Sequence, residues 1–424
     1  MIKHLVIIEY GIIRRASDYP PSERASTLKN RVVSDAVFAS LKDLAFRANV
    51  EGIFDFFIQK GRECLRIKNF VGLLQTERGI QIEILPKIGA GNDIEEARVG
   101  LLKMLQYVPY LPFYSFNQAH LQQVRLPIWE IFVTMFIEEV EKITQQGIQK
   151  SYITVENQQP FLKGKWLLNR QSYIHSKGFY VATDEFLTDI IPNRLIKTCL
   201  VFLAKSSNLL SNQTRLRRLC FAWKEVDFSN NTEVDFKQVR HLGKSFERYQ
   251  RALQWAAILL NQGSWYGAGQ NLNQSLLFPT EQLFEHYVAM GFKKYLTDFE
   301  VSYQDRVHHL LNDHLGKNRF GLRPDWVLKR GEKTIVIDAK WKWIEPNAPN
   351  FGIEQADLYQ LYAYGKKYKA DQLFLIYPAH ASFTFPLPPF FYDKHLILMV
   401  VPFQVTKSLG EQMQVLIELM GVSE

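Results

Sequence analysis

Two aspartates and a lysine in the last third of the sequence flank a predicted β-hairpin. Asp325 precedes one apolar run, Asp338 and Lys340 close the next, and a polar connection at Arg330-Gly331 separates the runs. If this connection has an even number of residues centred on that dipeptide, Asp325 lies opposite Val336. Because side chains alternate between the faces of a strand, Asp338 is then diagonal to Asp325, and Lys340 projects to the same face. The spacing therefore predicts two carboxylates and an ammonium group on one surface.

Such a group of charges suits metal-assisted hydrolysis of a phosphodiester. Two neighbouring carboxylates repel each other unless a cation lies between them, and Mg²⁺ or Mn²⁺ prefers oxygen ligands. A water on the metal becomes a better nucleophile, and the metal offsets charge that develops on a phosphoryl oxygen. Lys340 could orient or deprotonate that water, or stabilise the transition state.

Each of these residues also has an ordinary structural interpretation. Asp-x-Lys is frequent by chance, and on an edge strand it is usually a solvated ion pair of little energetic value. Pro324-Asp325 is a common turn dipeptide. However, the run that ends at Asp338 is typical of an interior strand, where an unpaired charge is costly. The combination at hairpin spacing therefore favours a functional site.

The pattern resembles the PD-(D/E)xK nuclease superfamily, with Pro324-Asp325 and Asp338-Ala339-Lys340 at the motif positions. The resemblance implies that both aspartates and the Ala339 carbonyl hold the metal. Glu285 lies in a segment similar to the helix that precedes the nuclease core, where an acidic residue can complete the metal shell. The alternative for Glu285 is a solvent-facing helix carboxylate.

A second flanking segment resembles the Q-x-x-x-Y helix that follows the core in these nucleases. Its residues here are Gln360 and Tyr364, whose i, i+4 spacing puts both side chains on one helical face. The resemblance implies that this face points toward the site. The alternative for Tyr364 is a core aromatic residue.

A longer series of motifs resembles the McrC family, the nuclease subunits of modification-dependent restriction systems. The similar segments run in order through almost the whole chain: 8–11, 68–72, 82–88, 161–165, 189–194, 323–325, 337–342, 356–364 and 375–378. The resemblance implies that this subunit cuts double-stranded DNA. It also implies a hexameric McrB-like AAA+ partner that hydrolyses GTP, recognises modified cytosine and translocates, and whose hydrolysis is stimulated when the N-terminal region of this subunit docks.

The chain is expected to bind no nucleotide itself. Gly243-Lys-Ser245 resembles the end of a phosphate-binding loop, but Gln238 occupies the position of the first glycine and no strand is predicted before it. The nucleotide is therefore assigned to the partner.

The predicted elements give a multidomain α+β fold. Residues 1–125 are expected to form a β-rich partner-docking domain, residues 126–265 a mainly helical connector, and residues 266–424 an α/β PD-(D/E)xK domain with a mixed sheet flanked by helices. The best boundary is the Gly-rich stretch 263–269. Helices are predicted over 92–107, 126–146, 193–204, 215–226, 246–260, 280–295 and 355–368. Strands are predicted over 5–14, 151–166, 372–377 and 395–401, and hairpins over 70–88 and around 330–331.

Composition narrows the class of protein without identifying it. The 424 residues contain 51 Lys and Arg against 43 Asp and Glu, a net charge of +8, which is weak support for a polyanionic ligand. Three scattered cysteines argue against a disulfide framework or a zinc site and fit a reducing compartment. No apolar run approaches the roughly 18 residues of a membrane span, so a cytoplasmic protein with no membrane contact is expected. Four lysines near the predicted site could contact phosphates: Lys342, Lys366, Lys367 and Lys369.

The sequence favours a Mg²⁺-dependent endonuclease subunit of an McrBC-like restriction complex, and two alternatives stay open. One is a stand-alone repair nuclease or exonuclease with the same core. The other is a non-catalytic adaptor that activates an AAA+ motor. The intact Asp325, Asp338 and Lys340 argue against the adaptor.

Overall fold

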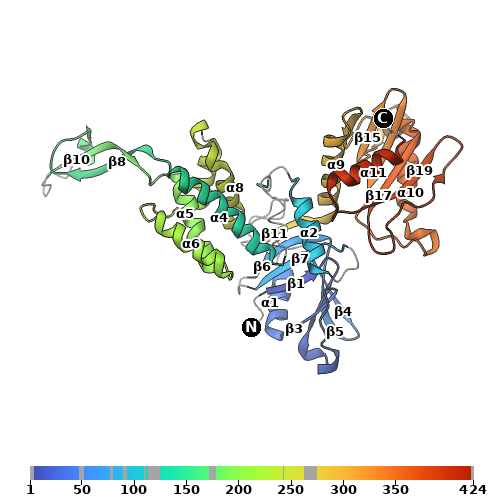
Figure 1. Ribbon diagram of the computed structural model, residues 1–424, viewed down its shortest axis with the longest axis horizontal. Coiled ribbons are helices and arrows are strands. Elements are labelled where there is room, and N and C mark those ends of the chain that lie inside the picture. The colour runs from blue at the N-terminus through green and yellow to red at the C-terminus, as the bar shows by residue number, and fades with distance from the viewer. Residues whose placement is uncertain are drawn as a thin grey trace. The chain divides into compact units, whose positions relative to one another are not determined.

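The chain folds into two compact units in the computed structural model (Figure 1). One unit combines Met1–Arg125 with Gly263–Glu424, and the other is Leu126–Gln262. The structure describes residues 4–46, 52–76, 80–88, 93–108, 111–112, 125–170, 178–241, 243–261 and 275–421. Within these ranges, no helix is long and apolar enough to cross a membrane. The division into three domains stays a prediction, and its Gly-rich boundary at 263–269 lies outside the described residues.

Two four-stranded sheets share one hydrophobic core in the N-terminal part of the first unit. The first sheet has the order β1-β7-β6-β11, with β1 (His4–Ile8), β6 (Phe70–Gln75), β7 (Gln81–Leu85) and β11 (Ser275–Pro279). The second has the order β3-β2-β5-β4, with β2 (Ile12–Arg15), β3 (Asn30–Val33), β4 (Phe54–Gln59) and β5 (Arg62–Ile67). Helix α1 (Asp35–Ala45) buries Phe38 and Leu41 in this core.

The predicted N-terminal elements are recovered with two changes. The run over 5–14 forms two strands in different sheets, because Tyr10 adopts a left-handed backbone (φ 59°) between them. The hairpin over 70–88 is confirmed by the antiparallel β6–β7 pair, although part of its turn (77–79) lies outside the described residues. Helix α2 (Ile94–Leu105) is capped by Asp93, whose carboxylate accepts from the backbone N–H groups of Glu95 and Glu96. Residue 92, where the sequence predicts this helix to begin, lies outside the described residues.

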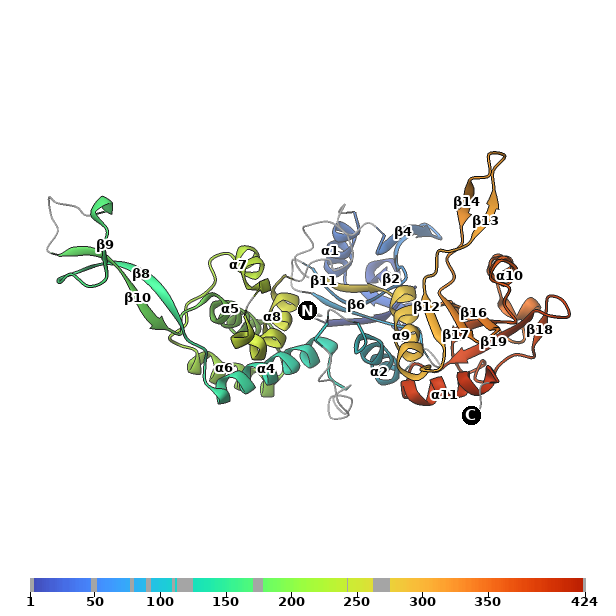
Figure 2. The same cartoon turned by 90° about the horizontal axis from the view of Figure 1, so that it is seen from above.

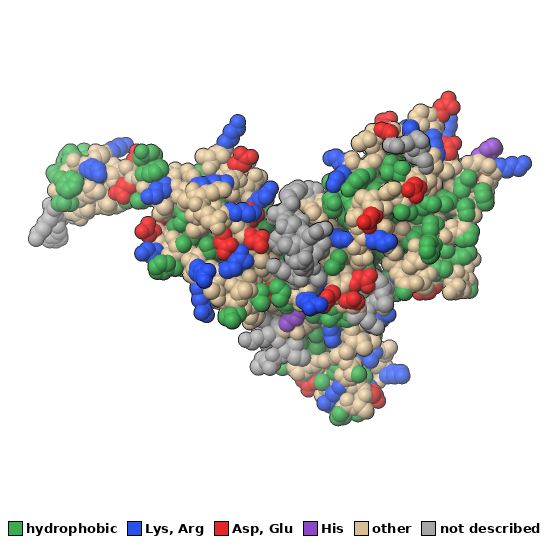
Figure 3. All heavy atoms as spheres, in the orientation of Figure 1, with side chains coloured by type: hydrophobic (Ala, Val, Ile, Leu, Met, Phe, Trp, Pro, Cys, Tyr) green, Lys and Arg blue, Asp and Glu red, His purple; other side chains and the backbone are tan. Residues whose placement is uncertain are grey.

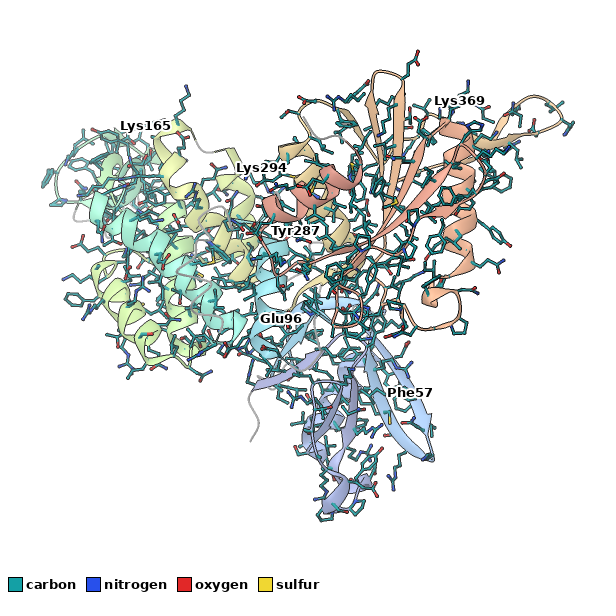
Figure 4. All side chains as sticks on the ribbon, turned by 45° about the vertical axis from the view of Figure 1, so that its right-hand side comes forward. Phe57, Glu96, Lys165, Tyr287, Lys294 and Lys369 are labelled. Carbon is teal, nitrogen blue, oxygen red and sulfur yellow. The ribbon has the colours of Figure 1, made fainter. Side chains whose placement is uncertain are left out.

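The second unit is a helical group from which a long hairpin extends (Figures 1 and 2). Its helices are α4 (Ile128–Gln146), α5 (Ile191–Ser206), α6 (Leu210–Ala222), α7 (Thr232–Gln238) and α8 (Gln250–Asn261). The hairpin pairs β8 (Ser151–Gln159) antiparallel with β10 (Phe179–Leu187), and the short β9 (Lys165–Trp166) adds to β10. The sequence predicted only the β8 side, as a short stretch. Lys165 of β9 is labelled in Figure 4.

The C-terminal part of the first unit is built on a six-stranded mixed sheet of order β12-β15-β16-β17-β19-β18. Its strands are β12 (Glu300–Tyr303), β15 (Trp326–Arg330), β16 (Lys333–Ala339), β17 (Gln372–Pro378), β18 (Phe390–Phe391) and β19 (Ile397–Phe403). Strands β16, β17 and β19 run parallel, and the other neighbours are antiparallel. A separate two-stranded ribbon, β13 (His309–Asn312) with β14 (Asn318–Gly321), lies between β12 and β15 in the chain.

Three helices accompany this sheet: α9 (Thr280–Tyr295), α10 (Gln355–Tyr368) and α11 (Leu409–Leu419). Helices α9 and α10 have the bounds that the sequence predicts. Tyr287 of α9, labelled in Figure 4, packs its ring against Phe403 of β19 and Tyr107, with ring centroids 5.9 and 5.5 Å away. The sheet is therefore anchored on α9 at one face, while α10 packs with β16 and β17 and contributes Leu361 and Tyr364 to a second core cluster.

Candidate active site

The β15–β16 hairpin sets the positions of the two aspartates. Its register pairs Arg330 with Lys333, so that the turn is the two-residue Gly331-Glu332, with Gly331 at the positive φ (59°) that such turns require. Continuing that register past β15 puts Asp325 opposite Asp338. The predicted pairing of Asp325 with Val336 is wrong, because the turn is centred one residue further along the chain. The predicted parity is right, and both aspartates are on one face.

Hydrogen bonds and an ion pair bring these groups together. Asp338 is 2% exposed, and its Oδ2 lies 2.7 Å from Lys340 Nζ. Asp325 Oδ2 accepts a 2.8 Å hydrogen bond from the backbone N–H of Ala339. The backbone N–H of Lys340 donates to Ile376 O at 2.9 Å, which continues the link between β16 and β17. The segment that carries the lysine is therefore fixed from both sides.

The site concentrates negative charge in a partly desolvated place. Burial raises the pKa of Asp325 well above its ordinary value, and the nearby Asp338 and Glu285 raise it further. Burial also raises the pKa of Asp338, although Lys340 opposes that rise. For Lys340, burial acts to lower the pKa, but Asp338 and the other carboxylates outweigh burial and raise it. The lysine is thus a cation at neutral pH.

Glu285 reaches the site from α9. Its Oε1 accepts a 2.8 Å hydrogen bond from Gln304 Nε2, and the backbone N–H of Gln304 donates to Asp325 O at 2.8 Å. Its influence on the pKa of Asp325 agrees with that proximity. The structure thus brings Glu285 to the two aspartates, with Gln304 as a link that the sequence did not reveal.

Gln360 and Tyr364 share one face of α10, as their spacing predicts, and this face lies toward the site, as the resemblance implies. Lys340 Nζ donates to Gln360 Oε1 at 3.4 Å. Tyr364 is 4% exposed and donates its hydroxyl hydrogen to Arg323 O at 3.2 Å, and burial raises its pKa to about 12. Gln360 therefore contacts the lysine directly, whereas Tyr364 is a buried aromatic residue that positions the chain just before Asp325.

Asp357 is a site residue that the sequence analysis missed. It is 8% exposed, and its Oδ2 accepts from Lys342 Nζ at 3.2 Å and from Tyr377 OH at 3.5 Å. Its charge contributes to raising the pKa of both Asp338 and Lys340. The available signal was its place three residues before Gln360, on the same helical face.

Two of the four lysines that were expected to contact phosphates are paired with carboxylates instead. Lys342 pairs with Glu354 at 2.8 Å and with Asp357, and Lys366 pairs with Asp393. Lys369, labelled in Figure 4, ends α10 in a left-handed conformation. These contacts leave the first two poorly placed to bind DNA without rearrangement.

Two tryptophans in the segment after Lys340 form hydrogen bonds with residues of the N-terminal sheet region. Trp341 Nε1 donates to the buried Glu9 carboxylate at 2.6 Å, and Trp343 Nε1 donates to Lys87 O at 3.0 Å. Lys87 Nζ also lies 3.9 Å from the centre of the Trp343 ring. The site and the N-terminal sheets are therefore parts of one compact unit that these contacts join.

The donor set suits a hard divalent cation. Asp325 and Asp338 offer carboxylate oxygens. Burial and then repulsion from Asp338 raise the pKa of Asp325, and a cation between the two carboxylates would relieve that repulsion. Among the described residues, no group of three or more His, Cys, Asp or Glu side chains could hold a metal ion. A metal at this place would therefore rely on two carboxylates, a backbone carbonyl and waters, which is the usual coordination of Mg²⁺.

The fold and the site together define a mixed α+β protein with paired aspartates and a lysine at the end of a central sheet. The family model described as McrBC 5-methylcytosine restriction system component matches residues 65–378. The chain belongs to this family, which confirms the resemblance found in the sequence.

Two solved structures are similar to this chain. One is the refined half-complex from the tetradecameric assembly of Thermococcus gammatolerans McrB AAA+ hexamers with bound McrC. Its matching chain has a TM-score of 0.72 and 17% identity, over 98% of this chain and 100% of that one. The other is the cryo-EM structure of the T. gammatolerans McrBC complex, with a TM-score of 0.51 and 16% identity, over 70% of this chain and 89% of that one. At these identities the likeness shows the fold. Among curated proteins, no match was found.

Proposed function

We propose that this chain is the DNA endonuclease subunit of a cytoplasmic McrBC-like restriction complex. The observation that carries the proposal is the convergence of Asp325, Asp338 and Lys340 at the end of β16, in a member of the McrBC family. An ion pair buried to this degree costs more to desolvate than a surface pair would, and such sites concentrate at functional positions.

Asp325 and Asp338 would hold Mg²⁺ or Mn²⁺ together with the Ala339 carbonyl and waters. Glu285 lies near this site and is linked to Asp325 through Gln304. The metal supplies an activated water and offsets charge on the phosphate. Lys340, held as a cation by Asp338 and Gln360, faces the same place and stabilises negative charge on the phosphoryl oxygens of the transition state. Because Asp338 and the other carboxylates raise its pKa, Lys340 is a cation that can also orient the nucleophile.

The partner in this proposal is a hexamer of an McrB-like AAA+ GTPase that recognises modified cytosine and whose hydrolysis this subunit stimulates. Support comes from the structural similarity to a chain of an assembly of McrB AAA+ hexamers with bound McrC. The sequence also lacks a nucleotide-binding loop, so that hydrolysis falls to another subunit.

The β8–β10 hairpin offers a surface for that partner. Tyr152 and Phe186 are 73% and 56% exposed, and their rings lie 5.0 Å apart on paired strands. Hydrophobic side chains gather near the far end of this hairpin beside lysines and arginines (Figure 3). Exposed aromatic residues on an otherwise polar ribbon are typical of a protein-binding surface. In the N-terminal region, by contrast, Lys68 pairs with Asp55 at 3.0 Å.

The test is cleavage of modified and unmodified DNA by the chain together with its AAA+ partner, with GTP or ATP and with or without Mg²⁺. Asp338→Asn is expected to reduce cleavage by about a thousandfold or more, because it removes a ligand charge and the partner of Lys340. Asp298→Asn makes the same chemical change at an exposed position and should leave cleavage unchanged. Binding to the partner should survive in both variants.

The alternatives give different results in the same assay. A stand-alone nuclease would cut without the partner or a nucleotide. An adaptor would stimulate nucleotide hydrolysis with no metal-dependent cleavage, and Asp338→Asn would then be silent. Full cleavage by Asp338→Asn would remove the site assignment itself.

A further inference from the structure

The β13–β14 ribbon begins and ends at the candidate active site. It is inserted between β12 and β15, and Figure 2 shows that it projects away from the six-stranded sheet. On one side it leaves the sheet just after Gln304, which is bonded to Glu285, and on the other it returns at Arg323, two residues before Asp325. Whatever contacts the base of the ribbon therefore lies next to the site.

Helix α10 holds the base of the ribbon in a fixed direction. Tyr368 donates its hydroxyl hydrogen to Asp305 Oδ1 at 2.7 Å, and its ring lies 4.5 Å from that of His308. Tyr364 bonds Arg323 O on the other side of the base. Because the same helix carries Gln360, the ribbon and the lysine of the site share one support.

Beyond this base the ribbon has no core of its own. All four residues of β14 are exposed, as are three of the four in β13. Its tip is shaped by Asp313, whose Oδ1 accepts from the backbone N–H groups of Leu315 and Lys317 at 2.9 Å. An isolated two-stranded ribbon is marginally stable in water. The ribbon is held at its base, and its strands are exposed to solvent beyond the base. Such a ribbon is suited to bind a partner.

The side chains of the ribbon identify the kind of partner. Between residues 306 and 323 there are four arginines and lysines and one acidic residue, Asp313. Asp313 is bonded to Arg319. Arg306 and Lys317 are exposed and pair with no carboxylate among the residues that the structure describes. These charges favour a polyanion.

An apolar group stands among these cations. Phe320 is 69% exposed, and Leu315 at the tip is 68% exposed. Phe320 also adopts a left-handed backbone (φ 55°), which is rare for a bulky residue and costs roughly 1–3 kcal/mol. Its strain and its exposure together mark it as a contact residue.

We propose that the β13–β14 ribbon enters the major groove of duplex DNA beside the scissile phosphate, and this inference rests on the proposed nuclease function. The major groove admits a two-stranded β-ribbon. Arg306 and Lys317 contact phosphates, and Phe320 makes an apolar contact in the groove. The ribbon thereby orients the backbone of the DNA toward Lys340.

The test measures binding of the full-length chain to a fluorescently labelled duplex by anisotropy, in EDTA, so that no cleavage occurs. The double variant Arg306→Ala/Lys317→Ala should bind more weakly. It should also reduce the slope of log K against log salt concentration by about 2, since each phosphate contact contributes about 1. Phe320→Gly should lose at least about fivefold in affinity with an unchanged slope. Glycine adopts the left-handed backbone freely, so the fold is kept.

Matched controls come from exposed residues elsewhere in the same unit. Lys60→Ala/Lys394→Ala removes the same charge, and Phe385→Ala removes a ring that is 80% exposed. Both should bind DNA as the wild type does. If they weaken binding as much as the ribbon variants do, the effect is one of net charge or exposed apolar surface, and the proposal is overturned.

Two further outcomes would overturn the proposal that the ribbon binds DNA and would leave the proposed nuclease function intact. In the first, the ribbon variants bind DNA like the wild type, while metal-dependent cleavage depends on Asp338. In the second, DNA affinity is unchanged but association with the AAA+ partner or with a second copy is lost in light scattering, which makes the ribbon a protein interface. Failure of the nuclease proposal is distinct: the wild type binds DNA through the ribbon and still cuts nothing.

Discussion

Glu9 is expected to make the stability of the first unit depend on pH. The side chain is 1% exposed, and its Oε1 accepts from Trp341 Nε1 at 2.6 Å and from the backbone N–H of Lys87 at 2.9 Å. Burial nevertheless raises its pKa from 4.5 to about 7, because these donors offset only part of the desolvation of the charge.

The sign follows from proton binding. Between the unfolded pKa of 4.5 and the folded pKa of about 7, the folded chain holds a proton that the unfolded chain has released. The contribution of Glu9 is therefore fully present below pH 4.5 and is lost as pH rises through about 7. At about 1.36 kcal/mol per pKa unit, this shift corresponds to a loss of about 3 kcal/mol.

The assay compares urea unfolding of the wild type and Glu9→Gln from pH 5 to pH 8. Glutamine stays neutral and keeps an oxygen for Trp341 Nε1. The difference in free energy of unfolding should therefore move by about 2.5 kcal/mol in favour of the variant between pH 5 and pH 8, because part of the total change falls below pH 5. Subtracting the two curves cancels the other titrating groups. Glu332→Gln, at the exposed turn of β15–β16, should run parallel to the wild type. Parallel curves for Glu9→Gln as well would refute the reasoning.

Three further predictions concern one site residue and two structural residues. Lys340→Ala should lower single-turnover cleavage about 10²–10³-fold, and an unchanged rate would exclude its role at the transition state. Arg98→Ala leaves the buried Glu83 without its 2.6 Å partner and should cost about 3–5 kcal/mol in urea unfolding, whereas a loss below 1 kcal/mol would contradict this. Gly72→Ala should cost about 2–4 kcal/mol by the same measurement, because a Cβ would lie 2.1 Å from Leu276 O at a φ of +126°; wild-type stability would show that β6 and β11 separate readily.

Local sequence patterns were sufficient to predict the helices and strands that carry the site residues. Amphipathic periodicity gives α9 and α10 with their observed bounds, and two apolar runs give β15 and β16. Strand alternation gives the shared face of Asp325 and Asp338 even though the turn is centred one residue later than expected. Because side chains alternate between the two faces of a strand, a register that differs by two residues still leaves Asp325 and Asp338 on the same face.

Pairing between strands that are far apart in the sequence could not be predicted from local patterns. Strand β11 completes the sheet of β6, about two hundred residues earlier in the chain, and nothing near Ser275 indicates that partner. Strand β10 was missed because apolar and polar residues do not alternate regularly along it. Asp357 and Gln304 were missed for a related reason: their types are ordinary, and only tertiary contacts bring them to the aspartates.

The position of the lysine links the two halves of the first unit. Lys340 is followed at once by Trp341, whose indole is held by Glu9 at the end of β1, while Trp343 is held by Lys87 after β7. Strands β1 and β7 are parallel neighbours, so both anchors belong to one edge of one sheet. A shift of that edge would therefore move the backbone on which Lys340 stands. Asp325 is tied to the same backbone, because its Oδ2 accepts from the N–H of Ala339, and it is also held through Gln304 and Tyr364. The N-terminal sheets are therefore part of the active-site scaffold.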